Sequence, residues 1–249
     1  MGIRLVDLFY SIQGEGRYSR RPAFFIRFPG CNLFCGLERP LRAGDYNQEY
    51  INKLKSDNAK WVCDTMAQWL SSGFYIEIDD IINYVINKSS GLYNIVFTGG
   101  EPLMNKSIIL SIINAFNERN LKPAVYEIET NGTIEPIKND LISYNVSLKL
   151  SGSGIEKSIR IKENVIKSFL MLNNVWWKFV ISDENDAIEA MQIVENYNIK
   201  KGNVYFMPAA FSREELIKNS SNVIELCKRF GVNYSPRLQI FVYDRYVGV

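Results

Sequence analysis

YNIVFTGGEPLMNKSIILSIINAFNERNLKPAVYEIETNG, residues 93–132, contains two apolar segments on either side of a helical pattern. Residues 93–100 and 124–132 are short segments, rich in residues that favour β-strands, and each ends at glycine, as strands that run into a turn do. Residues 106–120 repeat apolar side chains at helical spacing. A strand, a helix and a second strand in this order form a βαβ unit, in which the strands run parallel. The segment therefore predicts an α/β fold.

The same alternation extends in both directions from this unit. Upstream, residues 23–28 (AFFIRF) predict a buried strand, and residues 77–89 predict a helix that begins near Asp79 or Asp80. Downstream, we predict strands at 145–151, 175–182, 203–209 and 237–245, and helices at 163–172, 184–198 and 212–231. About six parallel strands fall short of the eight of a closed barrel, so we expect a partial (β/α) barrel. A doubly wound open sheet is the alternative, and either architecture binds its ligand at the carboxyl ends of the strands.

One segment interrupts the alternation. Residues 36–62 lose apolar periodicity and are polar and charged, with one short helix predicted around QEYINKLK, residues 48–55. We interpret this segment as an insertion into a single domain that spans residues 1–249.

The composition limits the possible classes of function. The formal net charge of +2 is too small for a strongly electrostatic nucleic-acid binder. The start of the chain becomes polar too early for a signal peptide, and no apolar run is long enough to span a bilayer. Four cysteines without a signal peptide favour a reducing, cytoplasmic location, where clustered cysteines act as ligands or catalysts. The chain has no histidine, so carboxylates, Lys, Arg, Cys or a cofactor must perform any chemistry.

Polar and glycine-rich motifs follow several of the predicted strands. They are SIQGEG (11–16), FPGCNLFCG (28–36), TGGEP (98–102), ETNG (129–132), SLK (147–149) and MPA (207–209). Taken singly, each motif is more often a simple turn. Glycines at 99 and 100 would let the backbone approach a ligand closely, and the carboxylate of Glu101 follows them directly. Together the motifs predict one ligand site at the strand ends.

Several of these motifs resemble those of a known family. Cys31-x3-Cys35, the later Cys63-Asp64-Thr65 and FTGGEP resemble the radical S-adenosylmethionine enzymes. FYSIQGEG, PAFFIRFPGCNLFC, FTGGEPL, ETNGT and SPRLQIFVYDRYVGV are similar, more narrowly, to the 7-carboxy-7-deazaguanine synthases. The resemblance runs from about residue 3 to residue 249.

The resemblance implies a reaction and its cofactors. The family is a lyase of the queuosine (7-deazaguanine) pathway that converts 6-carboxy-5,6,7,8-tetrahydropterin to 7-carboxy-7-deazaguanine and ammonia. It uses S-adenosyl-L-methionine, Mg²⁺ and a 4Fe-4S cluster held by three thiolates, with one iron left open. Cys31, Cys35 and Cys63 would be those ligands, whereas Cys227 has the apolar neighbours of a core residue. Glu15, Arg27 and other motif residues would bind the small molecules.

The resemblance also assigns these roles residue by residue. The substrate would contact Ile12, Gln13, Gly14, Glu15, Arg27, Thr98, Glu129 and Val249. S-adenosylmethionine would contact Val62, Asp64, Gly99, Gly100, Glu101, Asn131, Ser147, Leu148, Lys149, Met207, Pro208, Ala209 and Ala210. Thr65 would ligate Mg²⁺, a hard cation that prefers oxygen. Flavodoxin or ferredoxin would donate the electron. The protein would be a homodimer and would bind neither membrane nor nucleic acid.

Two positions depart from the family pattern, and three alternatives stay open. Gln239 replaces a histidine, and Leu148 replaces a proline. The first alternative is an activase that makes a glycyl radical on a partner protein. The second is a metal-stabilised binding protein without catalysis. The third is a zinc site that uses three cysteines and either Cys227 or a carboxylate.

Overall fold

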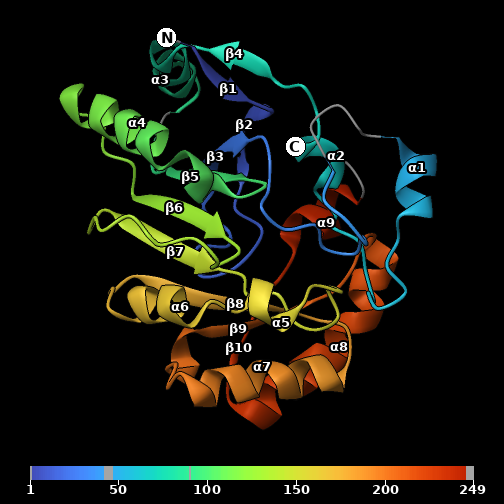
Figure 1. Ribbon diagram of the computed structural model, residues 1–249. Coiled ribbons are helices and arrows are strands. Elements are labelled where there is room, and N and C mark those ends of the chain that lie inside the picture. The colour runs from blue at the N-terminus through green and yellow to red at the C-terminus, as the bar shows by residue number, and fades with distance from the viewer. Residues whose placement is uncertain (1, 42–46, 90, 245–249) are drawn as a thin grey trace.

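The computed structural model describes residues 2–41, 47–89 and 91–244, and its main feature is one curved sheet (Figure 1). In spatial order the strands are β10 (Asn233–Tyr234), β9 (Val204–Pro208), β8 (Val175–Ile181), β7 (Ile142–Val146), β6 (Val125–Thr130), β5 (Asn94–Gly99), β3 (Pro22–Phe28) and β2 (Asp7–Ile12). Neighbouring strands from β3 to β10 pair in parallel, and β2 pairs antiparallel with β3. From β3 to β10 the order follows the chain without reversal, which confirms the partial barrel and excludes a doubly wound sheet.

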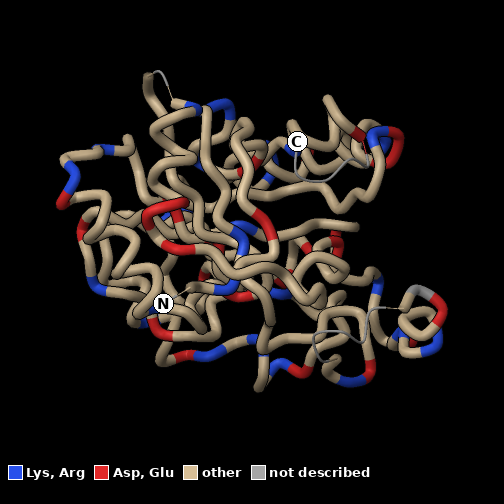
Figure 2. Tube along the Cα trace, turned by 90° about the horizontal axis from the view of Figure 1, so that it is seen from above, with Lys and Arg blue, Asp and Glu red and all other residues tan. Residues whose placement is uncertain are grey.

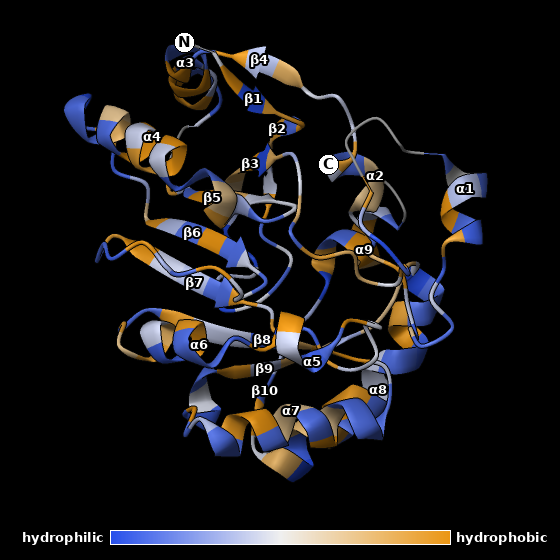
Figure 3. Ribbon diagram, viewed as in Figure 1, coloured by the Kyte–Doolittle hydropathy of each residue, from blue (hydrophilic) through white to orange (hydrophobic). Residues whose placement is uncertain are grey.

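Helices cover the convex side of the sheet. The longer ones are α3 (Ile78–Lys88), α4 (Lys106–Glu118), α6 (Glu163–Leu170), α7 (Glu184–Asn196) and α8 (Arg213–Phe230). Shorter ones are α1 (Gln48–Lys53), α2 (Met66–Trp69), η1 (Pro102–Asn105), α5 (Lys157–Arg160), η2 (Lys201–Asn203) and α9 (Leu238–Tyr243). The long helices carry both apolar and polar residues (Figure 3), as expected of helices with one buried face. A separate antiparallel pair, β1 (Ile3–Leu5) with β4 (Phe74–Ile76), lies beside α3.

The two faces of the main sheet differ in polarity. On β6, Tyr126 and Ile128 pack into the main hydrophobic core under the helices. Because successive side chains of a strand point to opposite faces, Glu127 and Glu129 face inward. The neighbouring strands add the inward polar side chains of Arg27, Thr98, Ser143, Asn145 and Lys178, beside an apolar cluster of Ala23, Phe25 and Val96. The outer face therefore stabilises the fold, whereas the inner face is equipped for a polar ligand.

Two predicted strands need correction. Residues 237–245 are wrong as a strand, because Leu238–Tyr243 form helix α9. A short apolar run suits either structure, and as a helix it places Ile240 against Ala210 and Leu216. The strand predicted at 145–151 lies instead at Ile142–Val146. Its polar inward residues hid it from a search for apolar runs.

The described residues of the segment 36–62 include the predicted short helix, α1, and pack onto the barrel. Leu37 and Ile51 form a small core with Met66, Trp69 and Leu70, and this core is separate from the main one. The backbone NH of Lys60 donates to Gly152 O at 2.8 Å. The Lys60 ammonium lies 2.7 Å from Asp186 Oδ1 and 2.8 Å from Asp183 Oδ2, at the start of α7. The segment before Cys63 is thus fastened to the loop after β7 and to the start of α7.

Charged residues of both signs are interspersed along the chain (Figure 2), which agrees with the small net charge. None of the helices in the described ranges combines the length and apolar character needed to cross a membrane.

Candidate active site

A cavity of about 860 Å³ opens at the carboxyl ends of the strands. Its walls come from the inner face of the sheet, the cysteine loop after β3, residues 61–69, and the tail that carries α9. In Figure 1, α2 and α9 lie on the side toward which the arrows of β6 and β7 point. The ligand site predicted at the strand ends therefore coincides with a cavity large enough for small molecules.

Three of the four cysteines line this cavity. They are Cys31, Cys35 and Cys63, whereas Cys227 is buried in the main core on α8. Burial, with a smaller contribution from the neighbouring thiols, raises the pKa of the Cys31 thiol to about 11 and that of Cys35 to about 12. A bound cation reverses this preference, because a coordinating thiol loses its proton.

Glycines allow the two cysteine segments to pack together. Gly36 has φ +85°, and a Cβ there would lie 2.4 Å from Val62 Cα, beside Cys63. The NH of Cys63 donates to Cys35 O at 3.2 Å across the same junction. A Cβ on Gly100 would lie 1.8 Å from the carbonyl oxygen of Gly30, next to Cys31. No side chain other than hydrogen fits at these positions, so the backbone approach that gathers the thiols depends on them.

The thiols do not form a site for a single ion. Within the described ranges, no three Cys, Asp or Glu side chains are gathered closely enough to bind one. An iron–sulfur cluster is larger than one ion, and three thiols on the wall of one cavity are the donor type that such a cluster requires. The cysteines therefore fit a cluster with three protein ligands.

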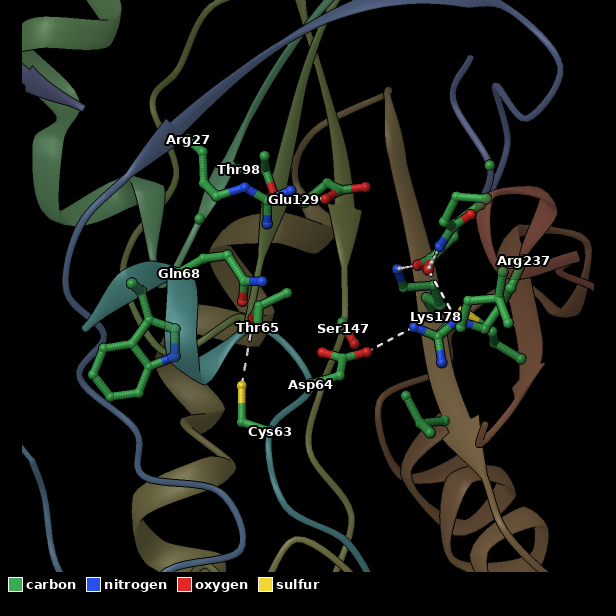
Figure 4. Close-up of a pocket in the computed structure, with 18 of the residues that line it drawn as sticks. Arg27, Cys63, Asp64, Thr65, Gln68, Thr98, Glu129, Ser147, Lys178 and Arg237 are labelled. Carbon is green, nitrogen blue, oxygen red and sulfur yellow. Dashed lines mark hydrogen bonds and ion pairs between the residues drawn. The ribbon is translucent and has the colours of Figure 1, made fainter. Parts of the chain in front are cut away.

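A second group of polar side chains comes from β3, β5 and β6 (Figure 4). Arg27 and Thr98 are register partners on adjacent strands. Thr98 Oγ1 donates to Glu129 Oε2 at 2.7 Å, and Gln13 Nε2 donates to Glu129 Oε1 at 3.3 Å. Arg27 Nε is buried and has no hydrogen-bond partner among the described residues. Nε lies 4.0 Å from Asp7 Oδ2, an ion pair too long for a hydrogen bond, so Nε can still donate to a ligand.

A third group surrounds the carboxylate of Glu15. Oε2 accepts from Lys178 Nζ at 2.5 Å, and Oε1 accepts from Arg237 Nε at 3.1 Å and from Gln239 Nε2 at 2.6 Å. The two cations hold the pKa of Glu15 at about 2, well below its usual value, despite its burial. Arg237 Nη2 also lies 2.7 Å from Asp64 Oδ2. One ion-pair network thus connects residues 13–16, β8, the tail and the segment after Cys63.

Most residues predicted for the site line the cavity. They are Ile12, Gln13, Gly14, Glu15, Arg27, Cys31, Cys35, Val62, Cys63, Asp64, Thr65, Thr98, Gly99, Gly100, Glu129, Asn131, Ser147, Lys149, Met207, Ala209 and Ala210. Glu101, Leu148 and Pro208 lie behind the wall, and Val249 lies outside the described residues. Glu101 accepts from Leu103 N, Thr130 Oγ1 and Asn131 N, and so holds the turn after β6 in place.

Sequence reasoning missed Lys178 and Arg237. Lys178 could have been recognised from the sequence, because a lone lysine in the apolar strand VWWKFVI implies a buried partner of opposite charge. Arg237 had no comparable signal, because its partners Glu15 and Asp64 are far away in the sequence.

Comparisons with known proteins agree with this geometry, although no family model matches the chain. The 7-carboxy-7-deazaguanine synthase of Clostridium acetobutylicum is 30% identical over 216 residues, which cover 84% of this chain and 82% of that protein. The synthase of Pyrobaculum aerophilum is 29% identical over 245 residues, with 97% and 95% covered.

Solved structures show the same fold. QueE from Escherichia coli matches with a TM-score of 0.58 at 19% identity, covering 94% of this chain and 93% of that chain. A histidine-tagged anSMEcpe with bound AdoMet matches with a TM-score of 0.50 at 16% identity, covering 85% and 61%. Because one of these relatives is 30% identical over more than four fifths of both chains, the chain belongs to the 7-carboxy-7-deazaguanine synthase family.

Proposed function

We propose that the chain is a radical S-adenosylmethionine lyase that converts 6-carboxy-5,6,7,8-tetrahydropterin to 7-carboxy-7-deazaguanine and ammonia. The observation that carries this proposal is that two groups of side chains line one cavity: the thiols of Cys31, Cys35 and Cys63, and the polar side chains of Arg27, Thr98 and Glu129. The names of the relatives support the same reaction.

Cys31, Cys35 and Cys63 would hold a 4Fe-4S cluster and leave one iron for S-adenosylmethionine. When bound, the cluster supplies the electron that cleaves S-adenosylmethionine and starts the radical chemistry. The backbone at Gly99 and Gly100, together with Asn131, would position the methionyl part of that cofactor. Further contacts would come from Val62, Asp64, Ser147, Lys149, Met207, Ala209 and Ala210, with Glu101, Leu148 and Pro208 supporting the wall behind them.

Arg27 would bind the carboxylate of the pterin, because its planar guanidinium suits a carboxylate and Nε has no hydrogen-bond partner within the described residues. Gln13, Thr98 and Glu129 offer hydrogen-bond donors and acceptors to the ring. Thr65 would give Mg²⁺ one hydroxyl oxygen, and the substrate carboxylate would give another. A Mg²⁺ held there would supply a Lewis acid beside the substrate.

The tail would exclude water from the reaction. Leu238 N donates to Gly14 O at 3.1 Å, and Arg237 bridges Glu15 and Asp64. These contacts hold α9 across the cavity, which suits a radical reaction that must be protected from solvent.

The test is an anaerobic incubation of the reconstituted protein with the carboxy-tetrahydropterin, S-adenosylmethionine and Mg²⁺, followed by mass analysis. We expect 7-carboxy-7-deazaguanine, and less of it without Mg²⁺. S-adenosylmethionine cleavage with an unchanged pterin would instead indicate a glycyl-radical activase. A protein that holds a full cluster but cleaves nothing would be a binding protein.

We further propose that flavodoxin or ferredoxin supplies the electron and that the chain works as a cytoplasmic homodimer. Product formation with each purified donor tests the first statement. Light scattering of the reconstituted protein tests the dimer.

A further inference from the structure

A second carboxyl group, Glu127, lies beneath Glu129 on the inner face of β6, and the proposed function gives it no role. It is 1% exposed. Gln13 Nε2 lies 3.1 Å from Glu127 Oε1 and 3.3 Å from Glu129 Oε1, so one side-chain amide donates to both carboxyl groups. Glu129 has a second donor in Thr98, whereas Glu127 Oε2 has no hydrogen-bond partner among the described residues.

The surroundings of Glu127 offer little to stabilise a negative charge. Its register partners are Val96 on β5 and Ser143 on β7. Asn145, the next inward residue on β7, also has side-chain atoms without a partner in the described part of the chain.

The charged groups that face Glu127 are Glu129 on its own strand and Lys178 on β8. Lys178 is 2.5 Å from Glu15 and is therefore already paired. Burial and the charge of Glu129 raise the pKa of Glu127 to about 8, and the Gln13 amide, Lys178 and the nearby Asn145 amide offset only part of that rise.

We propose that Glu127 is a positioning residue that works as a neutral carboxyl group, which together with Gln13 holds Glu129 against Thr98 so that the two glutamates carry one negative charge. This inference rests on the proposed function, in which Glu129 binds the pterin. It also fixes the Gln13 amide, because Nε2 faces both carboxyl groups while Oε1 accepts from Glu15 N at 3.2 Å. Ionisation of Glu127 would place a second charge beside Glu129 and disturb both side chains.

The role predicts a specific pH profile. In the wild type, kcat/KM should fall on the alkaline side with a midpoint near the pKa of Glu127, about 8. Glu127→Gln keeps the shape and the acceptor for Gln13 but cannot ionise. It should retain kcat/KM within about threefold at neutral pH, equivalent to less than about 1 kcal/mol, and should lose the alkaline decline. Glu127→Leu removes the acceptor and should raise KM at every pH. A purely structural role would leave the decline unchanged in Glu127→Gln.

Infrared difference spectroscopy tests the neutral carboxyl group without turnover. The wild type minus Glu127→Gln should show the C=O stretch of a protonated carboxyl group at neutral pH, which disappears as Glu127 ionises. Glu129→Gln should lower the midpoint of that change, because it removes the charge that raises the pKa.

An ionised Glu127 at neutral pH would overturn the inference, as would an alkaline decline that persists in Glu127→Gln. If the wild type forms no product, the proposed function is wrong, whereas the infrared band still decides whether Glu127 is neutral.

Discussion

The guanidinium of Arg237 lies 2.7 Å from the carboxylate of Asp64, the residue that follows Cys63. The same guanidinium donates to Glu15 Oε1 and to the carbonyl oxygen of Ala210. Its side chain is 8% exposed, so these bonds form largely away from water. The tail, the substrate loop and the third cysteine segment are therefore held by one side chain.

Replacing Arg237 by Met should lower the free energy of unfolding by about 2–4 kcal/mol, because it removes charged hydrogen bonds to the largely buried Glu15 and Ala210 and the ion pair to the more exposed Asp64. Arg229→Met is the matched control. The Arg229–Glu184 pair is half exposed, and its loss should change stability by less than about 1 kcal/mol. Denaturant unfolding measures both. Equal losses in the two variants would contradict the network described for Arg237.

The depressed pKa of Glu15 predicts a dependence of stability on acid. Its pKa is about 2 in the folded chain, against an ordinary value of 4.5. A lowered folded pKa stabilises the fold above the unfolded value, and this contribution is lost as the pH falls from about 5 toward 2. The stability difference between wild type and Glu15→Gln should shrink over that range. A constant difference, measured by urea unfolding at each pH, would mean that Glu15 has an ordinary pKa.

Breaking the ion pairs of Lys60 should weaken the binding of the proposed iron–sulfur cluster. Lys60→Met removes the ion pairs to Asp183 and Asp186 that fasten the insertion beside Cys63. We expect the reconstituted protein to release iron to a chelator several-fold faster. Lys53→Met, in the same insertion but with an exposed Glu49 partner, should behave as wild type. Identical iron release from the two variants would argue against the fastening role.

Glu101 should affect stability through the turn after β6. Glu101→Ala leaves three donors, on Leu103, Thr130 and Asn131, without their acceptor in a buried site. The free energy of unfolding should fall by roughly 3 kcal/mol or more. Exposed Glu118→Ala is the control and should change it by less than about 0.5 kcal/mol. Thermal unfolding of both variants decides the matter, and a mild effect at Glu101 would refute its role in the turn.

The parts of the fold predicted from sequence are those in which periodicity and burial agree. Helices such as α7 bury one stripe, and strands such as β5 are apolar with a glycine at the end, so local pattern was enough. Helix α9 was missed because a short apolar run fits helix and strand alike, and its contact with residues 13–16 decides between them.

The parts of the candidate site that could not be predicted from sequence lie on the inner face of the barrel. Lys178 is buried because its carboxylate partner, Glu15, comes from a distant loop, and no local pattern encodes that pairing. The polar residues Ser143 and Asn145 concealed β7, because they interrupt the apolar run by which a buried strand is recognised. Glu101 was recognised as part of a motif, but a motif does not tell which side of the wall a side chain faces. The cysteine set was predicted through the family resemblance, and all three thiols line one cavity.

The central claim is that Cys31, Cys35 and Cys63 make this cavity the site of pterin turnover. It is tested most directly by comparing Cys63→Ala with Cys227→Ala, reconstituted and assayed together under anaerobic conditions. We predict that Cys63→Ala loses bound iron and sulfide and forms no 7-carboxy-7-deazaguanine. Cys227→Ala, altered only in the core, should keep its cluster and form product at a rate near that of wild type. Equal cluster content and equal product formation in the two variants would contradict the claim.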